Sequence, residues 1–337
     1  MDLQTISHYQ IIGPLGAGGM GAVFLAEDTK LDRRVAIKFL PAALTSDEKA
    51  KARLICEARS AAKLDHPNIC CIYEVIEEEP ACIVMEYVEG DTLSDKIRGH
   101  PLTTKKALDL VIQVAAALEE VHSCGMIHRD IKPENVVVTP RGRVKLLDFG
   151  LAKMVQQPLS DTEKTAGQRP VTKAGSIVGT VAYMSPEQAT GGAIGPRSDI
   201  FSLGTVLYEC LTGMRPFCGA TAMEVGANVI FANPPPPSDF KRGVPSELDR
   251  IILRMLEKKP EARYQSAGKL IEDLRRVHDS LPEEEFGHVP GNCQESTDLN
   301  TTVSTVLQKK LRRPFAFPTA FFNRACNRIG QALSLIL

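Results

Sequence analysis

The spacing of apolar residues divides the chain into a strand-rich region and a helix-rich region. Residues 9–88 have the pattern of strands, interrupted at residues 46–64 by apolar positions that recur every three or four residues. That interval is typical of one amphipathic helix. Residues 101–281 look helix-rich, and Thr103 or Thr104 can cap a long first helix. The pattern therefore predicts an α+β protein.

Two motifs near the middle of the chain carry the clearest chemistry. The run His128-Arg129-Asp130-Ile131-Lys132-Pro133-Glu134-Asn135 is followed, after strand-like residues, by Asp148-Phe149-Gly150. Phosphoryl transfer to a hydroxyl needs a carboxylate that orients the nucleophile and cations that neutralise the phosphates. The two motifs contain suitable groups, which are Asp130, Lys132, Asn135 and Asp148.

A glycine-rich stretch lies near the N-terminus, at Leu15-Gly16-Ala17-Gly18-Gly19-Met20-Gly21-Ala22-Val23. Glycine allows a backbone to approach phosphates closely, which suits either a phosphate-covering turn or a dinucleotide-binding fold. The dinucleotide fold expects a helix directly after the glycines, whereas residues 22–26 resemble a strand. Val35-Ala36-Ile37-Lys38 then follows, and this order favours the phosphate-covering turn.

Taken together, these motifs and their order resemble the protein kinase family, and Lys132 with the Pro-Glu after it resembles the Ser/Thr branch. The runs Gly-Gly-Met-Gly, Glu-Tyr-Val-Glu-Gly and Met-Ser-Pro-Glu-Gln are most similar to bacterial members of the eukaryotic-type Ser/Thr kinases. The resemblance covers residues 9–281. It implies a two-lobed fold, with a small antiparallel sheet lobe with one helix at 9–88 and a larger, mainly helical lobe at 89–281.

The resemblance also implies the catalytic roles. Asp130 would be the base, Lys132 and Thr180 would stand beside it, and Lys38 would bind the α- and β-phosphates of ATP. Glu57 would hold Lys38 in place, with Glu48 as the main alternative. Mg²⁺, or Mn²⁺ in its place, would be bound by Asn135 and Asp148.

ATP would lie between the lobes. Met85 would be the gatekeeper, and the Glu86 carbonyl and the Val88 amide would bind the purine edge. The residues expected around the nucleotide are Leu15, Gly16, Ala17, Gly18, Gly19, Met20, Gly21, Ala22, Val23, Ala36, Lys38, Met85, Glu86, Val88 and Val137.

The stretch between Asp148 and Pro186 is long and polar and corresponds to the activation segment of the family. In kinases with an arginine before the catalytic aspartate, here Arg129, a phosphorylated residue of this segment pairs with the guanidinium. The sequence therefore suggests autophosphorylation at Thr172 or Ser176. The alternative is that these hydroxyls only solvate a loop.

Three further residues have structural counterparts in the family. Glu187 would form a buried ion pair with Arg263. Asp199 would hold the backbone of the catalytic loop, although an aspartate before an apolar helix could also be a simple N-cap.

Composition adds limits to this picture. The chain has 337 residues, a net charge of −1 and no tryptophan, and no region interleaves aromatic with basic residues, so we expect no nucleic-acid partner. Nine scattered cysteines and the absence of a signal peptide or an apolar span favour a cytoplasmic protein. Residues 1–8 would be an extension of the kinase domain.

Residues 282–337 have the composition of a linker followed by a basic and apolar tail. Within it, residues 309–337 could dock peripherally on a membrane or on a protein partner, or could pack on the domain or stay disordered. The expected function is an ATP-dependent Ser/Thr protein kinase acting in signalling. The rival classes are a pseudokinase scaffold, which usually lacks Lys38, Asp130 or Asp148, and a small-molecule kinase, which would lack the Ser-Pro-Glu segment.

Overall fold

The computed structural model divides the chain into two compact units, Met1–Glu283 and Glu284–Leu337. The description that follows covers residues 5–18, 21–40, 47–78, 80–98, 100–148 and 181–282. All of them belong to the first unit. The domain boundaries expected at residues 9 and 281 stay predictions.

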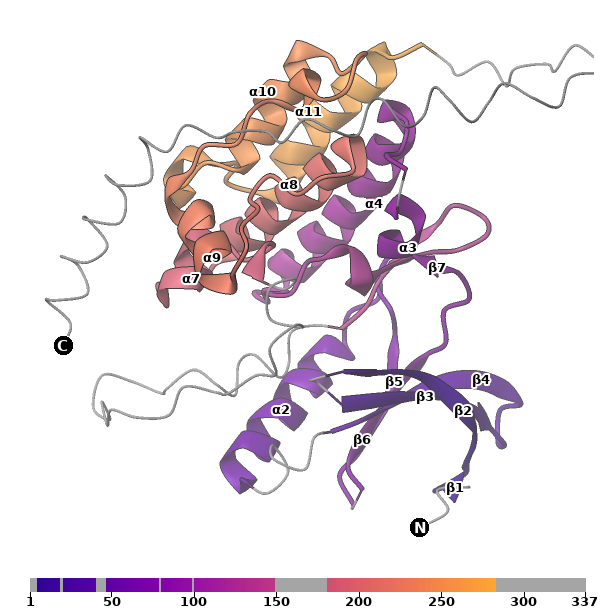
Figure 1. Ribbon diagram of the computed structural model, residues 1–337. Coiled ribbons are helices and arrows are strands. Elements are labelled where there is room, and N and C mark those ends of the chain that lie inside the picture. Colours follow the sequence, from indigo (N-terminus) through magenta and orange to yellow (C-terminus); the bar gives the residue numbers. More distant parts are fainter. Residues whose placement is uncertain are drawn as a thin grey trace, which may run out of the picture. The chain divides into compact units, whose positions relative to one another are not determined.

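The N-terminal region is a six-stranded antiparallel sheet with the order β1-β2-β3-β4-β6-β5 (Figure 1). Its strands are β1 (Thr5–Ile6), β2 (Tyr9–Gly18), β3 (Gly21–Asp28), β4 (Arg33–Phe39), β5 (Ile72–Ile76) and β6 (Cys82–Glu86). The glycine-rich stretch forms the β2–β3 hairpin, in which Gly18 pairs with Gly21. A strand directly after the glycines argues against a dinucleotide-binding fold, which has a helix there.

Among the described residues of this region, one helix, α2 (Glu48–Ala61), lies beside the sheet (Figure 1). The Asp47 carboxylate caps its first turn by accepting hydrogen bonds from the amides of Lys49 and Ala50. Leu54 and Ala58 on its apolar face pack with Ile83 of β6. The helix expected at residues 46–64 is therefore confirmed, with slightly shorter ends.

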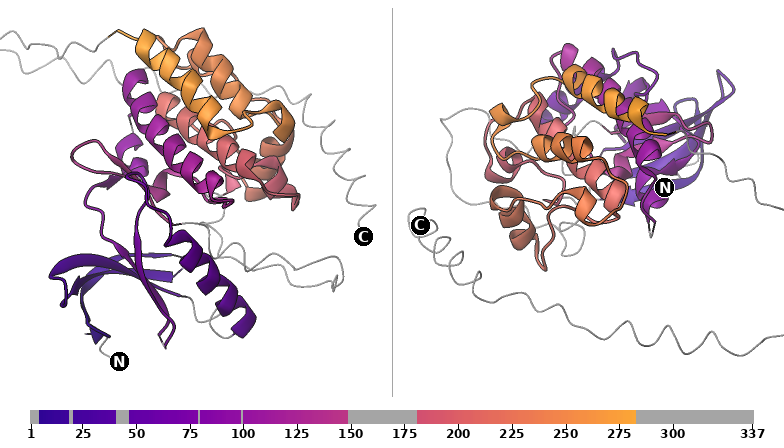
Figure 2. Two further views of the ribbon diagram at one scale, coloured as in Figure 1. Left: turned by 180° about the vertical axis from the view of Figure 1, so that it is seen from behind. Right: turned by 90° about the horizontal axis from the view of Figure 1, so that it is seen from above.

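The second region is mainly helical, and its core is formed largely by α4, α8, α10 and α11. Its elements are β7 (Asp91–Thr92), α3 (Leu93–Ile97), α4 (Thr104–Ser123), η1 (Pro133–Asn135), β8 (Val136–Val138), β9 (Val144–Leu146), α7 (Pro186–Thr190), α8 (Pro196–Thr212), α9 (Ala222–Phe231), η2 (Pro237–Asp239), α10 (Ser246–Met255), η3 (Pro260–Ala262) and α11 (Ala267–Ser280). Thr103 is the N-cap of α4 and accepts a hydrogen bond from the Lys106 amide. Both views of Figure 2 show α11 alongside α4.

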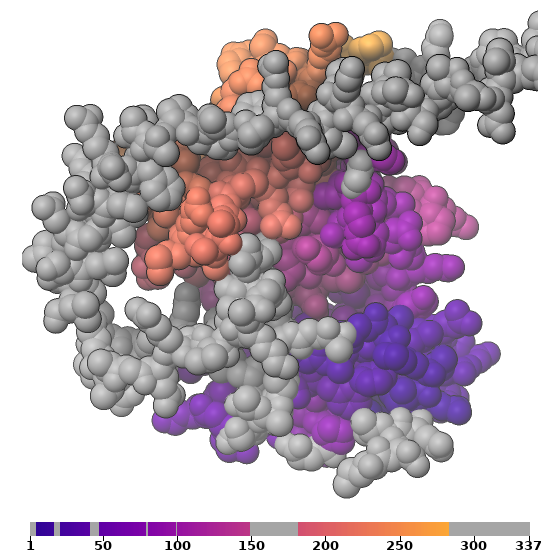
Figure 3. All heavy atoms as spheres, viewed as in Figure 1, coloured from indigo at the N-terminus to yellow at the C-terminus, as the bar shows by residue number. Residues whose placement is uncertain are grey.

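The two regions form separate masses in the space-filling view, the sheet in indigo and violet and the helices in magenta to orange (Figure 3). An α+β, two-lobed architecture is thus confirmed. Near the junction of the lobes, β7, β8 and β9 form a small antiparallel sheet. The loops on either side of β8 and β9 carry the two catalytic motifs, because η1 ends directly before β8 and Asp148 follows β9 by two residues.

Candidate active site

The carboxylate of Asp130 lies in a ring of polar contacts inside the catalytic loop. Its Oδ2 atom is 2.8 Å from Lys132 Nζ and accepts a hydrogen bond from Asn135 Nδ2 at 2.9 Å. Asn135 Nδ2 also donates to the Asp130 carbonyl at 2.8 Å. Asp130 is 4% exposed, so these donors compensate a charge that burial would otherwise disfavour. The three residues predicted from the sequence motif are thus brought together.

Asp199 holds the backbone that leads into Asp130. Its Oδ2 accepts the His128 amide and its Oδ1 accepts the Arg129 amide, each at 2.8 Å. His122 Nε2 lies 2.9 Å from the same Oδ2. The helix α8 begins at Pro196 after an N-cap at Gly195, so the alternative view of Asp199 as an N-cap is wrong.

His128 supports the loop from inside the core. Its Nε2 contacts the Leu147 carbonyl at 3.0 Å, and its Nδ1 accepts the Asp130 amide at 3.3 Å. A carbonyl can only accept, so the proton lies on Nε2. Burial lowers the pKa of His128, although Asp199 and Asp130 act in the opposite direction. Because Nδ1 accepts a hydrogen bond, the imidazole is neutral, and it joins the catalytic loop to Leu147, the residue before Asp148.

Lys38 on β4 reaches across to Asp148, with 2.7 Å between Nζ and Oδ1. Asp148 has a φ of 46°, a left-handed conformation that is uncommon for a residue with a side chain. A lysine and the motif aspartate are thus in direct contact. Among the described residues, no ion pair joins Lys38 to Glu57 or Glu48.

Glu57 lies on α2 with one carboxylate oxygen buried. Its Oε2 has no hydrogen-bond partner among the described residues, and the same holds for the buried Nε of Arg129. Burial raises the pKa of Glu57, and the positive charges of Arg129 and Arg53 counteract this rise. The pairing of Glu57 with Lys38 stays a prediction.

The residues expected around the purine come from both lobes. Ala36 on β4 and Met85 on β6 are cross-strand neighbours, and Val23 on β3 lies opposite Lys38 on β4. Ala36 and Val137 are each 6% exposed. Leu15 is 46% exposed, which agrees with its position near the turn of the β2–β3 hairpin. These positions are compatible with a purine between the lobes, and the contacts themselves stay predictions.

The side chain of Glu86 connects β6 to β9. Its Oε2 lies 2.8 Å from Lys145 Nζ and accepts the Cys71 amide at 3.3 Å. Lys145 Nζ also donates to the Ile69 carbonyl at 3.2 Å. The Glu86 carbonyl, expected to bind the purine, accepts a hydrogen bond from Cys70 Sγ at 3.5 Å and has a second lone pair.

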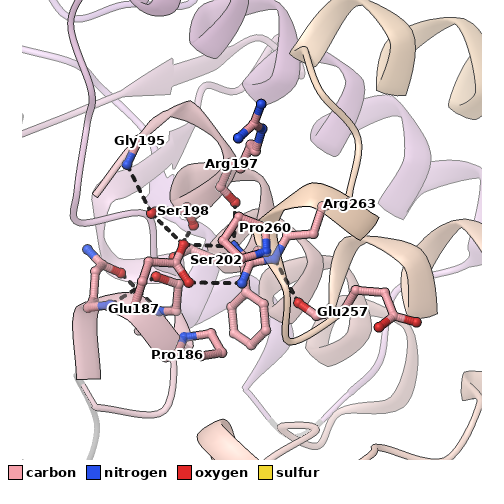
Figure 4. A network of polar contacts seen from close by, with 12 residues as sticks. Pro186, Glu187, Gly195, Arg197, Ser198, Ser202, Glu257, Pro260 and Arg263 are labelled. Atoms are coloured by element: carbon pink, nitrogen blue, oxygen red, sulfur yellow. Dashed lines mark hydrogen bonds and ion pairs between the residues drawn. The ribbon is translucent and has the colours of Figure 1, made fainter. Parts of the chain in front are cut away.

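Glu187 and Arg263 form the buried ion pair that the sequence suggested (Figure 4). Arg263 is 0% exposed, and its Nη1 and Nη2 bind the two carboxylate oxygens at 2.8 and 2.9 Å. Ser198 Oγ donates to Glu187 Oε1 at 2.6 Å. Burial alone would raise the pKa of Glu187, but the hydrogen bonds from Arg263 and Ser198 bring it below its ordinary range.

Several expected residues fall outside the described part of the chain. These are Gly19, Met20, Thr172, Ser176, Thr180 and residues 309–337. For Ala17 and Gly18 only the backbone, in β2, is described. Conversely, sequence reasoning missed Lys145, His122 and the contacts of Gln188. Gln188 alone has a sequence signal, because Ser185-Pro186-Glu187-Gln188 is a capping-box pattern.

The oxygen donors near Asp148 suit a hard divalent cation. Asn135 uses Nδ2 for both of its hydrogen bonds, so its Oδ1 receives none from the described residues. A carboxylate and an amide oxygen, completed by phosphate and water oxygens, are typical Mg²⁺ ligands. No group of three or more histidine, cysteine or acidic residues could hold a metal within the described ranges.

Comparisons with known proteins agree with this geometry. A model of the protein kinase domain matches residues 9–273. The chain is 40% identical over 282 residues to the serine/threonine-protein kinase PknB of Mycobacterium leprae, covering 82% of this chain and 44% of that protein. It is 38% identical over 309 residues to the serine/threonine-protein kinase PrkC of Bacillus subtilis, covering 90% and 45%. The chain thus spans less than half the length of these relatives.

A solved structure points the same way. The crystal structure of the Mycobacterium tuberculosis PknI kinase domain is similar with a TM-score of 0.62 at 26% identity, and it covers 81% of this chain and 97% of that one. The chain belongs to the protein kinase domain family. Within that family, its sequence groups with the eukaryotic-type Ser/Thr protein kinases of bacteria. Members of the family generally use ATP and a divalent metal.

Proposed function

We propose that this domain transfers the γ-phosphoryl group of ATP to Ser or Thr hydroxyls of protein substrates. The observation that carries the proposal is the Asp130 carboxylate, held by Lys132 and Asn135 within 3 Å. A carboxylate held in this way can orient a hydroxyl and accept its proton. Lys132 can neutralise charge on the transferred phosphoryl group. A Ser or Thr acceptor is supported by the similarity of the chain to serine/threonine-protein kinases.

The nucleotide would lie between the lobes, with Lys38 on its α- and β-phosphates. ATP supplies the phosphoryl group, and Mg²⁺, or Mn²⁺ in its place, would neutralise its charge from Asn135 and Asp148. The backbone of Glu86 and Val88 would bind the purine edge. The β2–β3 hairpin supports this arrangement, since its glycine-rich end can approach phosphates closely.

Nucleotide binding would require Lys38 to leave Asp148. Its new partner would be Glu57, whose buried Oε2 atom lacks a hydrogen bond among the described residues. An unsatisfied buried acceptor costs about 1–3 kcal/mol, so pairing with Lys38 would recover part of the cost of breaking the Lys38–Asp148 contact. A Glu57→Gln variant should therefore have a raised KM for ATP, while Glu48→Gln should not.

Arg129 would then be available to a phosphate on the activation segment, at Thr172 or Ser176. Its buried Nε atom, without a partner among the described residues, supports this role. Phosphosite mapping of the wild-type chain and of Asp130→Asn would test autophosphorylation. An active enzyme without phosphate between residues 160 and 180 would exclude it.

The main test is transfer of labelled phosphate from ATP to a generic basic protein, followed by phosphoamino-acid analysis. We expect phosphoserine or phosphothreonine from the wild type and none from Asp130→Asn. ATP binding without transfer would instead favour a pseudokinase, and a labelled metabolite without labelled protein would favour a small-molecule kinase.

No helix in the described ranges has both the length and the apolar character needed to cross a membrane. The docking proposed for residues 309–337 concerns the other compact unit. Co-sedimentation of the full chain and of residues 1–281 with liposomes would test it. Equal partitioning of the two would exclude the tail as a membrane anchor.

A further inference from the structure

Gln188 on α7 makes two hydrogen bonds that point in different directions. Its Oε1 accepts the Ser185 amide at 2.9 Å, and Ser185 Oγ in turn accepts the Gln188 amide at 3.3 Å, which together form the capping box of α7. Its Nε2 donates to the backbone carbonyl of Arg129 at 3.0 Å. One side chain thus joins the helix after the activation segment to the residue before Asp130.

The orientation of this amide is determined by its two partners. A backbone N–H can only donate and a backbone carbonyl can only accept, so Oε1 must face Ser185 and Nε2 must face Arg129. Glutamate could keep the first contact, as it does in most capping boxes, but it has no N–H for the second. The two roles of Gln188 can therefore be separated by a single substitution.

Arg129 is a residue whose backbone needs outside support. Its φ is 67°, a left-handed conformation that costs an arginine free energy and persists only when its surroundings hold it. Asp199 Oδ1 binds its amide and Gln188 binds its carbonyl. That carbonyl belongs to the peptide group whose nitrogen is the amide of Asp130. The two contacts therefore determine the orientation of the backbone at the catalytic aspartate.

Helix α7 is itself anchored on its other side. Glu187, adjacent to Gln188, is held by the buried guanidinium of Arg263. The contact with Arg129 thus starts from a helix that is attached to the core of the large lobe. A small movement of α7 would be transmitted to the Asp130 backbone through the hydrogen bond between Gln188 and the Arg129 carbonyl.

We propose that Gln188 is a positioning residue for the catalytic aspartate, acting through the Arg129 carbonyl. This role rests on the kinase function proposed above. It predicts that loss of the amide N–H lowers turnover, while the stability of α7 and the binding of ATP stay close to those of the wild type. Misplacement of a reacting group by about 1 Å can cost roughly 100-fold in rate, so a loss of about tenfold is expected for a partial displacement.

The test compares Gln188→Glu with Ala189→Gly in the full chain. Gln188→Glu keeps the cap and loses the bond to Arg129. Ala189→Gly loosens the same helix at an exposed position without touching the catalytic loop. We expect Gln188→Glu to lower kcat about tenfold, with KM for ATP within about twofold of the wild type. Ala189→Gly should lower Tm and leave kcat within about twofold.

A second measurement keeps the inference independent of the proposed function. Hydrogen exchange by mass spectrometry should show faster exchange of a peptide spanning residues 128–133 in Gln188→Glu, and wild-type rates there in Ala189→Gly. If the wild type transfers no phosphate, the kinase proposal fails and this comparison still decides the structural role. Unchanged kcat and exchange in Gln188→Glu, or equal effects in both variants, would overturn the inference.

Discussion

Replacing Glu187 by alanine should be one of the most destabilising single changes in the domain. The substitution removes the carboxylate that Arg263 binds through Nη1 and Nη2. Arg263 is 0% exposed, so water cannot replace the lost partner without a rearrangement of the core. The guanidinium keeps three carbonyl acceptors, those of Arg197, Glu257 and Lys258. Its charge, however, has lost its only carboxylate partner among the ion pairs of the described residues.

The size of the effect follows from these contacts. Two charge-assisted hydrogen bonds at about 1.5–3 kcal/mol each give roughly 3–6 kcal/mol. This range agrees with the loss of about 3–5 kcal/mol typical of breaking one side of a buried ion pair. In a domain of this size, such a loss corresponds to a decrease in Tm of roughly 10 °C.

Urea denaturation of the wild type, of Glu187→Ala and of a variant at an exposed ion pair would measure this loss of stability. The control is Glu272→Ala, which breaks the exposed ion pair with Lys269 and should leave the stability close to that of the wild type. Because the pKa of Glu187 is lowered in the folded chain, its contribution is complete above its ordinary value of 4.5. This contribution to stability is lost as the pH falls through the pKa that Glu187 has in the folded chain. A loss below about 1 kcal/mol in Glu187→Ala would refute this reasoning.

Three other predictions test separate parts of the structure. Burial lowers the pKa of Lys258 from 10.5 to about 8. Between pH 8 and 10.5, the Lys258 side chain is therefore protonated in the unfolded chain and neutral in the folded chain. Stability should therefore rise with pH from 8 to 10.5, and Lys258→Met should lose that rise in urea titrations at both ends of this window. Lys145→Met should cost about 1–3 kcal/mol, and a double-mutant cycle with Glu86→Gln should show a coupling; additive losses would contradict the pairing. Asp199→Asn places a side-chain N–H against a backbone N–H and should lower the free energy of unfolding by about 1–3 kcal/mol. The Arg129 amide should also exchange hydrogen faster, and unchanged exchange would contradict the anchoring role.

Much of the fold could be predicted because local pattern and tertiary structure agree. In α2 and α4 the apolar residues recur at the interval that places them on one buried face, and the N-cap Thr103 is one of the two caps expected from the sequence. The β2–β3 hairpin at the glycines follows from strand-like residues on both sides of them. Helix ends were less predictable, because a shift of one or two residues hardly changes the buried face.

The site was predictable where a motif fixes the spacing within one loop. Asp130, Lys132 and Asn135 are such a case. The contact of Lys38 with Asp148 and the buried unpaired oxygen of Glu57 were not predictable. The environment of Glu57 depends on where α2 lies, and the Lys38–Asp148 contact depends on how β4 lies relative to the loop after β9. A sequence motif encodes neither position. The same holds for contacts between elements distant in sequence, such as that of Gln188 with Arg129.

Gly90, in the linker after β6, limits how this chain can be varied. Its φ is 153°, and a Cβ atom there would lie 2.4 Å from the Val138 carbonyl oxygen of β8. Any other residue would have to push the linker away from the small sheet. The flanking Glu89 and Asp91 are exposed and have no such restriction. A mutational library of this linker should therefore return glycine at position 90 and a broad range of residues on either side of it.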